Sequence, residues 1–205
     1  MNAPKRSFKK IIQKLKSYYG PPAPPKTNDP FELILWENVA YLVDDVKRER
    51  VFDELREKVG TRPSDILNAS IDQLDQVTKL GGASPQRHSS RLKECALIAF
   101  NEFGGDLNAV LKLPVAKSIR ALQQFPSFGE PGAEKILLFS GTHPILALDS
   151  NGLRVLLRLG FGEEKKNYAG SYRSVREAIA DEVNDDCNTL IESAPTSTST
   201  RQEYL

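Results

Sequence analysis

Asp149 lies at the point where an apolar segment gives way to an amphipathic helix. The run Ile-Leu-Ala-Leu precedes it, and Ser150, Asn151 and then GLRVLLRLGF follow, with leucines on one helical face. An aspartate in this place predicts an N-cap, because its carboxylate accepts hydrogen bonds from the first turn of the helix. A carboxylate also stabilises positive charge that develops on a bound substrate. Capping and catalysis are compatible at such a position.

A second carboxyl group, Glu37, lies in one of the most apolar stretches of the chain, LILWENVAYLV. Burial disfavours the charged form of a carboxyl group, so these surroundings predict a raised pKa and a group that is still protonated near physiological pH. A protonated carboxyl group can act as a general acid. Two structural interpretations stay open for Glu37: an ion pair with an arginine, and an exposed position on its helix.

The segment FPSFG at residues 125 to 129 predicts a tight turn between two helices, with Pro131 and the run GAEKILLFSG after it. The first backbone N–H groups of a helix have no partner within the helix, and together they form a local anion site that needs little net charge. Ser127 fits such a turn less well than glycine, which adopts positive φ more readily.

Short helices must position these groups. Helical periodicity, N-terminal prolines and capping residues predict helices at residues 8–19, 30–47, 48–59, 63–69, 70–80, 86–103, 106–113, 114–124, 132–141, 152–161 and 171–193. The helix at 30–47 is apolar nearly all round, which predicts a buried element. No segment alternates as a strand does, so the predicted fold class is all-α. Residues 194–205 are small and polar and predict a flexible tail.

The composition is that of an ordinary soluble protein, with 40% hydrophobic and 27% charged residues among 205. No apolar run approaches the ~18 residues that a membrane span needs, and the N-terminus lacks a secretory signal, so we expect a cytoplasmic protein without membrane contact. Cys95 and Cys187 lie far apart and without a nearby pair of histidines. They therefore argue against a disulfide framework and against a zinc or iron–sulfur site.

The net charge of +1 gives the chain as a whole no basic footprint for nucleic acid. Residues 1–28 are an exception, since they carry lysines and one arginine but no acidic residue. This segment is either a phosphate-facing patch or a solvated helix face.

Residues 30 to 161 resemble the helix-hairpin-helix DNA glycosylase superfamily, the group that contains endonuclease III and the mismatch adenine glycosylases. The resemblance is carried by PFELIL at 30–35, FPSFGEPGA at 125–133 and HPILALDSNGLRVLLRLGF at 143–161. It implies an all-α fold of two helical lobes with a cleft between them that holds Asp149. We expect a basic helix and connector at residues 1–28, a glycosylase-like domain at residues 29–193 and a flexible tail after it. The bundle of this domain spans residues 48–148. The second lobe combines residues 149–193 with residues 1–47, so the N-terminal segment packs with it.

The resemblance also implies a chemistry. Asp149 occupies the position of the family's catalytic aspartate, which stabilises the cationic sugar as an N-glycosidic bond breaks. Pro131 stands where bifunctional members carry a catalytic lysine, so we expect a monofunctional enzyme. Lys135, one helical turn further on, is an alternative amine nucleophile. The family's hairpin grips a DNA phosphate, which predicts contacts from residues Pro126, Ser127, Phe128, Gly129 and Gly132.

An ungapped alignment from Pro30 places Glu37 where mismatch adenine glycosylases carry their catalytic glutamate. Their Gln-Gln stretch is replaced by Tyr41-Leu42, so adenine is not assigned as the substrate. Tyr41 or Leu42 is a candidate wedge for the hole that base flipping leaves, and Trp36 a candidate stacking platform for the flipped base. Wholly structural roles for all three stay open.

The expected function is excision of a damaged or mispaired base from double-stranded DNA by a monomer that needs no cofactor and no metal, free in the cytoplasm or associated with a bacterial-type nucleoid. The alternative is a helix-hairpin-helix module that binds DNA but has lost productive chemistry. A third possibility is an all-helical interaction protein that shares only the scaffold.

Overall fold

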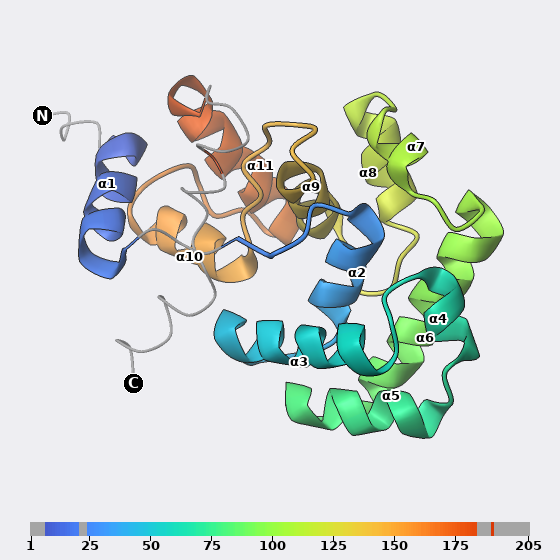
Figure 1. Ribbon diagram of the computed structural model, residues 1–205. Helices are drawn as coiled ribbons and strands as arrows, with labels where there is room; N and C mark the ends of the chain where they lie inside the picture. Colours follow the sequence, from blue (N-terminus) through green and yellow to red (C-terminus); the bar gives the residue numbers. More distant parts are fainter. Residues whose placement is uncertain (1–6, 21–23, 184–189, 191–205) are drawn as a thin grey trace, which may run out of the picture. The chain divides into compact units, whose positions relative to one another are not determined.

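The computed structural model describes residues 7–20, 24–183 and 190 (Figure 1). Two compact units emerge: a larger one from Pro25 to His143, and a smaller one from the segments that precede and follow it. Among the described residues, helices form all the regular structure apart from one isolated bridge between Tyr41 and Gly82. The predicted all-α fold class is confirmed. No helix in these residues is both long and apolar enough to cross a membrane.

The larger unit is a bundle built around α2 (Pro30–Asn38). Seven of the nine residues of α2 are buried, as its nearly continuous apolar sequence predicts, and it packs against the helices labelled α3, α6 and α9. The remaining helices of this unit are α3 (Asp45–Lys58), α4 (Pro63–Asn68), α5 (Ile71–Thr78), η1 (Lys79–Gly81), α6 (Pro85–Phe103), α7 (Asn108–Leu111), α8 (Val115–Leu122) and α9 (Glu130–Phe139).

Two expectations about α2 are wrong. The helix predicted at residues 30–47 ends at Asn38, because the chain turns there and the Tyr41 N–H donates instead to the Gly81 carbonyl at 3.1 Å. The second expectation places α2 in the second lobe, with the rest of residues 1–47. From Pro25 onward, however, the chain belongs to the bundle, and α2 with it. An apolar helix without a polar face needs neighbours on every side, and the bundle provides them.

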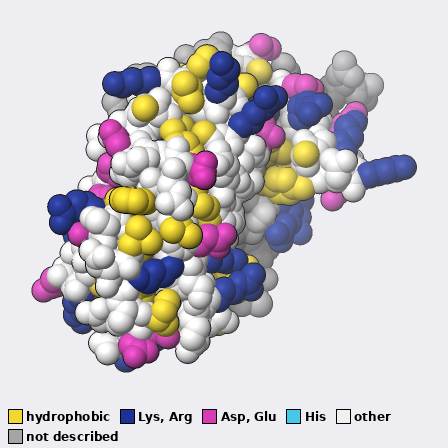
Figure 2. All heavy atoms as spheres, turned by 90° about the vertical axis from the view of Figure 1, so that its right-hand side faces the viewer, with side chains coloured by type: hydrophobic (Ala, Val, Ile, Leu, Met, Phe, Trp, Pro, Cys, Tyr) yellow, Lys and Arg dark blue, Asp and Glu magenta, His cyan; other side chains and the backbone are white. Residues whose placement is uncertain are grey.

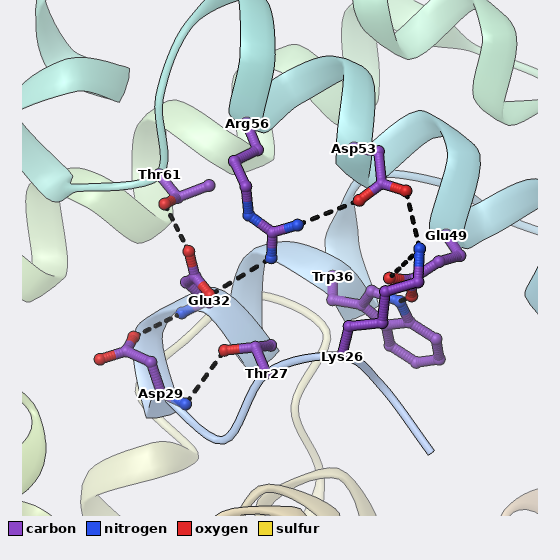
Figure 3. A network of polar contacts seen from close by, with 9 residues as sticks. All are labelled: Lys26, Thr27, Asp29, Glu32, Trp36, Glu49, Asp53, Arg56 and Thr61. Atoms are coloured by element: carbon purple, nitrogen blue, oxygen red, sulfur yellow. Dashed lines mark hydrogen bonds and ion pairs between the residues drawn. The ribbon is translucent and has the colours of Figure 1, made fainter. Parts of the chain in front are cut away.

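A polar network fastens α2 to α3 and to the segment that precedes α2 (Figure 3). Glu32 accepts a hydrogen bond from Thr61 and pairs with Arg56 at 3.5 Å. Arg56 also pairs with Asp53 at 3.0 Å, and Asp53 in turn holds Lys26 at 3.0 Å. The network fixes the start of α2 against α3.

The smaller unit contains α1 (Phe8–Tyr19), α10 (Ser150–Arg158), α11 (Tyr168–Ile179) and η2 (Ala180–Glu182). The Glu182 carboxylate accepts hydrogen bonds from the Ser7 hydroxyl at 2.6 Å and from the Phe8 N–H at 3.1 Å. The Phe8 ring meets the edge of Phe161, with centroids 6.2 Å apart. The predicted N-terminal helix is therefore docked within this unit. The helix predicted at 171–193 begins earlier, and α11 ends at Ile179. Residues 184–189 and 191–193 of the predicted helix, and the predicted tail, lie outside the described residues.

Candidate functional site

The predicted helix-hairpin-helix is present, with α8 and α9 joined by residues 123–129. Ser127 adopts a φ of +70°, and the Phe128 N–H closes the turn on the Phe125 carbonyl at 3.3 Å. The left-handed region costs a non-glycine residue free energy, so the surroundings of Ser127 must impose it. The turn therefore keeps the backbone path that glycine would adopt more readily.

Phe128 and Gly132 form the packed side of the hairpin. The Phe128 ring is 9% exposed, and a Cβ atom added at Gly132 would lie 3.0 Å from its Cδ1 atom. A larger side chain at position 132 would push this ring out of place. Phe128 thus serves packing through its ring, whereas Ser127 and Gly129 are exposed and Pro126 is half-buried.

The N-terminus of α9 offers fewer donors than a typical helix. Pro131 has no N–H, and the Ala133 N–H donates to the Gly129 carbonyl at 3.1 Å. The N–H groups of Glu130 and Gly132 donate to no acceptor among the described residues, which leaves them for an anion. The exposed Glu130 carboxylate lies in the same turn and opposes that anion.

Asp149 caps α10 as predicted. Its Oδ1 atom accepts a hydrogen bond from the Gly152 N–H at 2.6 Å, and its side chain is half-buried. The segment before Asp149 is fixed by its apolar residues. Leu146 and Leu148 are buried, and the Leu148 N–H donates to the Tyr172 hydroxyl at 3.4 Å. Asp149 belongs to the smaller unit, and all the other predicted site residues belong to the bundle.

Glu37 pairs with Lys135, a partner that the sequence did not reveal. Their Oε1 and Nζ atoms are 2.6 Å apart. Burial raises the pKa of Glu37, but the charges of Lys135 and Arg48 outweigh it, and the pKa is lowered overall. The expectation that Glu37 stays protonated is therefore wrong. The ion-pair interpretation is the better one, although a lysine holds the place expected for an arginine.

Trp36 is a core residue with a polar anchor. It is 5% exposed, and its Nε1 atom donates to Glu49 Oε2 at 2.9 Å. Two cations lie against its ring, the Arg48 guanidinium at 4.5 Å and the Lys135 ammonium at 5.3 Å from the centroid. This burial favours the structural role of Trp36 over that of a platform for a flipped base, because its ring is already covered.

Tyr41 and Leu42 form an exposed loop after α2. They are 57% and 59% exposed, and Leu42 adopts a φ of +57°, which is strained for a branched apolar residue. The positive φ of Leu42 persists only because the surrounding structure imposes it.

The loop is braced by two features that sequence reasoning did not use. A Cβ atom added at Gly82 would lie 2.7 Å from the Tyr41 carbonyl oxygen, so only glycine permits this approach. Buried His88 faces the Asn38 carbonyl through Nδ1 at 2.9 Å and the Ala83 carbonyl through Nε2 at 3.1 Å. The adjacent glycines in the sequence were the one available signal, since paired glycines often mark a close backbone approach.

Among the described residues, no group of three or more His, Cys, Asp or Glu side chains could hold a metal ion. Cys95 is buried on α6, and burial raises the pKa of its thiol well above the usual range. Cys187 lies outside the described residues.

The fold is that of helix-hairpin-helix DNA glycosylases. A solved endonuclease III–DNA complex matches 94% of this chain and 84% of its own, with a TM-score of 0.69 at 16% identity. A thermostable thymine-DNA glycosylase matches 93% of this chain and 79% of its own, with a TM-score of 0.59 at 17% identity. The 3-methyladenine DNA glycosylase MagIII of H. pylori, bound to 1,N6-ethenoadenine, matches 91% of this chain and 93% of its own, with a TM-score of 0.68 at 15% identity.

No protein-family model and no curated protein sequence matches the chain. The likeness to these structures therefore confirms the predicted fold, and it comes from the arrangement of the helices rather than from close sequence similarity.

Proposed function

We propose that this chain, built on the glycosylase fold, is a monomeric DNA glycosylase that hydrolyses the N-glycosidic bond of a damaged or mispaired base and leaves an abasic site. The observation that carries the proposal is the Ser127 backbone. Its φ of +70° is a strained conformation for serine, and such strain often occurs where a backbone is shaped to bind a ligand. The turn leads into the first turn of α9, where the N–H groups of Glu130 and Gly132 have no acceptor among the described residues and can donate to a phosphate.

Asp149 is the proposed catalytic carboxylate. Its Oδ1 atom is engaged by the Gly152 N–H, and its second oxygen atom accepts no hydrogen bond from the described residues, so it can face a substrate. As the bond between the sugar and the base breaks, positive charge develops on the sugar. A carboxylate next to that charge lowers the energy of the transition state and can orient the attacking water.

The proposal excludes lyase chemistry on two grounds. Pro131 has no amine, and the Lys135 ammonium is held 2.6 Å from the Glu37 carboxylate. An amine nucleophile must direct its nitrogen at the sugar, whereas the Nζ atom of Lys135 is directed at Glu37.

The exposed Tyr41–Leu42 loop is the proposed wedge. When a base flips out, an apolar side chain that enters the stack can take its place against the neighbouring bases. Leu42 is the better candidate of the two, because its positive φ ties the direction of its side chain to a strained backbone that Gly82 and His88 support.

The test uses Asp149→Asn on labelled duplexes that carry uracil, mismatched thymine, oxidised pyrimidines, alkylated purines or adenine opposite oxidised guanine, each with and without alkali. Asparagine is as good an N-cap as aspartate, so the variant keeps α10 and loses only the charge. We expect alkali-dependent strand breaks with the wild type and their loss in Asp149→Asn. Asp29→Asn, at the N-cap of α2, is the matched control and should retain activity. Equal activity in both variants would exclude Asp149 as the catalytic group.

A DNA-binding module without activity is the second candidate. It is favoured by the lack of a free amine nucleophile on α9, since Pro131 carries none and the Lys135 ammonium is paired with Glu37. Duplex binding without cleavage of any base would support this candidate, and strand breaks without alkali would instead indicate a lyase.

A further inference from the structure

The Lys135–Glu37 ion pair is polar, preorganised and still open to solvent. The two side chains are 29% and 24% exposed, although the paired atom Glu37 Oε1 is itself buried. One side of the pair is therefore fixed within the protein, and the other side is within reach of a ligand.

The surroundings hold the lysine in place. Its ammonium lies 5.3 Å from the centroid of the Trp36 ring and 5.7 Å from that of Phe139. Trp36 is anchored in turn by its hydrogen bond to Glu49. Aromatic rings attract a cation without offering it a hydrogen-bond acceptor, so N–H donors of the ammonium remain available.

The position of the pair within the bundle connects it to both proposed DNA contacts. Glu37 lies in the last turn of α2, directly before the exposed Tyr41–Leu42 loop. Lys135 lies on α9, the helix that begins at the hairpin, and the two helices pack together. The two helices that hold the pair thus also lead to both proposed DNA contacts.

We infer that Lys135 and Glu37 together form the base-recognition site, and that they select pyrimidines with an imide edge, a ring carbonyl beside a ring N–H, which leave the sugar as anions. Uracil and thymine have this edge. The inference rests on the proposed function and names the substrate class of the same enzyme.

Hydrogen bonding accounts for the selection. An ammonium has three N–H donors, and one that is not directed at Glu37 can donate to the O2 carbonyl of the base. The second carboxylate oxygen of Glu37 can accept from N3–H. Cytosine has a lone pair at N3, which would face that carboxylate unpaired, and a buried polar group left unpaired costs about 1–3 kcal/mol.

The chemical step follows the same arrangement. The bond between C1′ and N1 breaks, and its electron pair stays with the base and spreads onto O2, where the Lys135 ammonium stabilises it. Water adds its oxygen to C1′ and releases one proton, and the departed base anion gains one, so the sum is the consumption of one water molecule. Since the pKa of Glu37 is lowered, this carboxylate has no proton to give to a purine ring nitrogen.

Single-turnover cleavage of uracil, 5-fluorouracil, mismatched thymine, cytosine, adenine and ethenoadenine duplexes tests the inference. We expect cleavage of the imide pyrimidines only, with 5-fluorouracil faster than uracil because its anion is more stable. Lys135→Met should lower the uracil rate by about a hundredfold, as the loss of a preorganised donor does. Lys135→Arg, which retains the cation, should recover part of that loss.

Lys58→Met is the matched control, since it breaks an exposed 2.5 Å pair with Glu54 on α3 and should not change the rate. Thermal melting of each variant separates misfolding from impaired recognition, and Lys135→Gln provides a second variant should Lys135→Met melt early. Asp149-dependent cleavage of purines in preference to uracil would overturn the inference and leave the proposed function standing. Absence of cleavage for every base, including the oxidised pyrimidines and alkylated purines named above, would overturn both.

Discussion

Ser127 carries strain that glycine would not. A φ of +70° destabilises an L-residue by about 1–2 kcal/mol. Glycine would remove this strain, but its more flexible unfolded chain would offset part of the gain in stability. We predict that Ser127→Gly stabilises the protein by about 0.5–1 kcal/mol and leaves duplex binding intact. Urea unfolding measures the stability, and fluorescence anisotropy measures the binding.

The control for this prediction is Ser64→Gly, in the exposed part of α4. Glycine within a helix is destabilising by roughly 0.5–1 kcal/mol relative to better helix formers, so the two substitutions should shift the urea midpoint in opposite directions. A loss of stability in Ser127→Gly would contradict the strain argument.

At the residue scale, the sequence located single groups and missed their partners. Asp149 was identifiable as a cap, because the apolar run before it and the leucine periodicity after it are local signals. The protonation of Glu37 was not predictable. It depends on Lys135 and Arg48, which the fold brings from two other helices, and the two cations together reverse the direction of the pKa shift expected from burial alone.

At the element scale, Glu32 links α2 to α3, and its pKa sets a pH dependence (Figure 3). Burial raises the pKa of Glu32, but hydrogen bonds from Thr27 and Thr61 and the charge of Arg56 together lower it. A lowered pKa in the folded state means that ionised Glu32 contributes stability above its unfolded pKa, and that this contribution disappears as the pH falls through the folded pKa.

We therefore predict that Glu32→Gln lowers the free energy of unfolding by about 1–2 kcal/mol at pH 7, and that the difference from the wild type shrinks as the pH falls below the ordinary pKa of 4.5. Chemical denaturation at several pH values measures it. Glu102→Gln, exposed on α6, should leave the unfolding free energy unchanged at each pH. A difference that stayed constant with pH would show that the charge of Glu32 is not what links the helices.

Most helices were predictable from local signals, and the failures arose where tertiary contacts override them. Prolines and capping residues predicted the starts of α4, α5 and α10 closely. The break after Asn38 had no such signal, since the apolar pattern continues through Tyr41 and Leu42. It is imposed by the glycines at 81 and 82, which let another part of the chain approach the backbone. Periodicity alone contains no information about such an approach.

At the scale of the whole molecule, charge is balanced. The net charge is +1, and the face in Figure 2 carries basic, acidic and hydrophobic side chains side by side. Bulk attraction to DNA is therefore weak, and local charge near the hairpin should matter more. We predict that Glu130→Gln strengthens duplex binding about twofold to fivefold at low salt, because it removes a carboxylate from the first turn of α9. The gain should diminish at high salt, where exposed charges are screened.

Glu57→Gln is the control that separates an effect of charge at the hairpin from an effect of net charge. It changes the net charge by the same amount as Glu130→Gln, but at an exposed position of α3. Fluorescence anisotropy titrations of both variants against one undamaged duplex, across a salt series, measure the two effects. If the hairpin is the phosphate contact, Glu57→Gln should bind as the wild type does while Glu130→Gln binds more tightly. An equal increase in duplex affinity for both variants would mean that binding depends on the net charge of the molecule. The hairpin would then not be the phosphate contact.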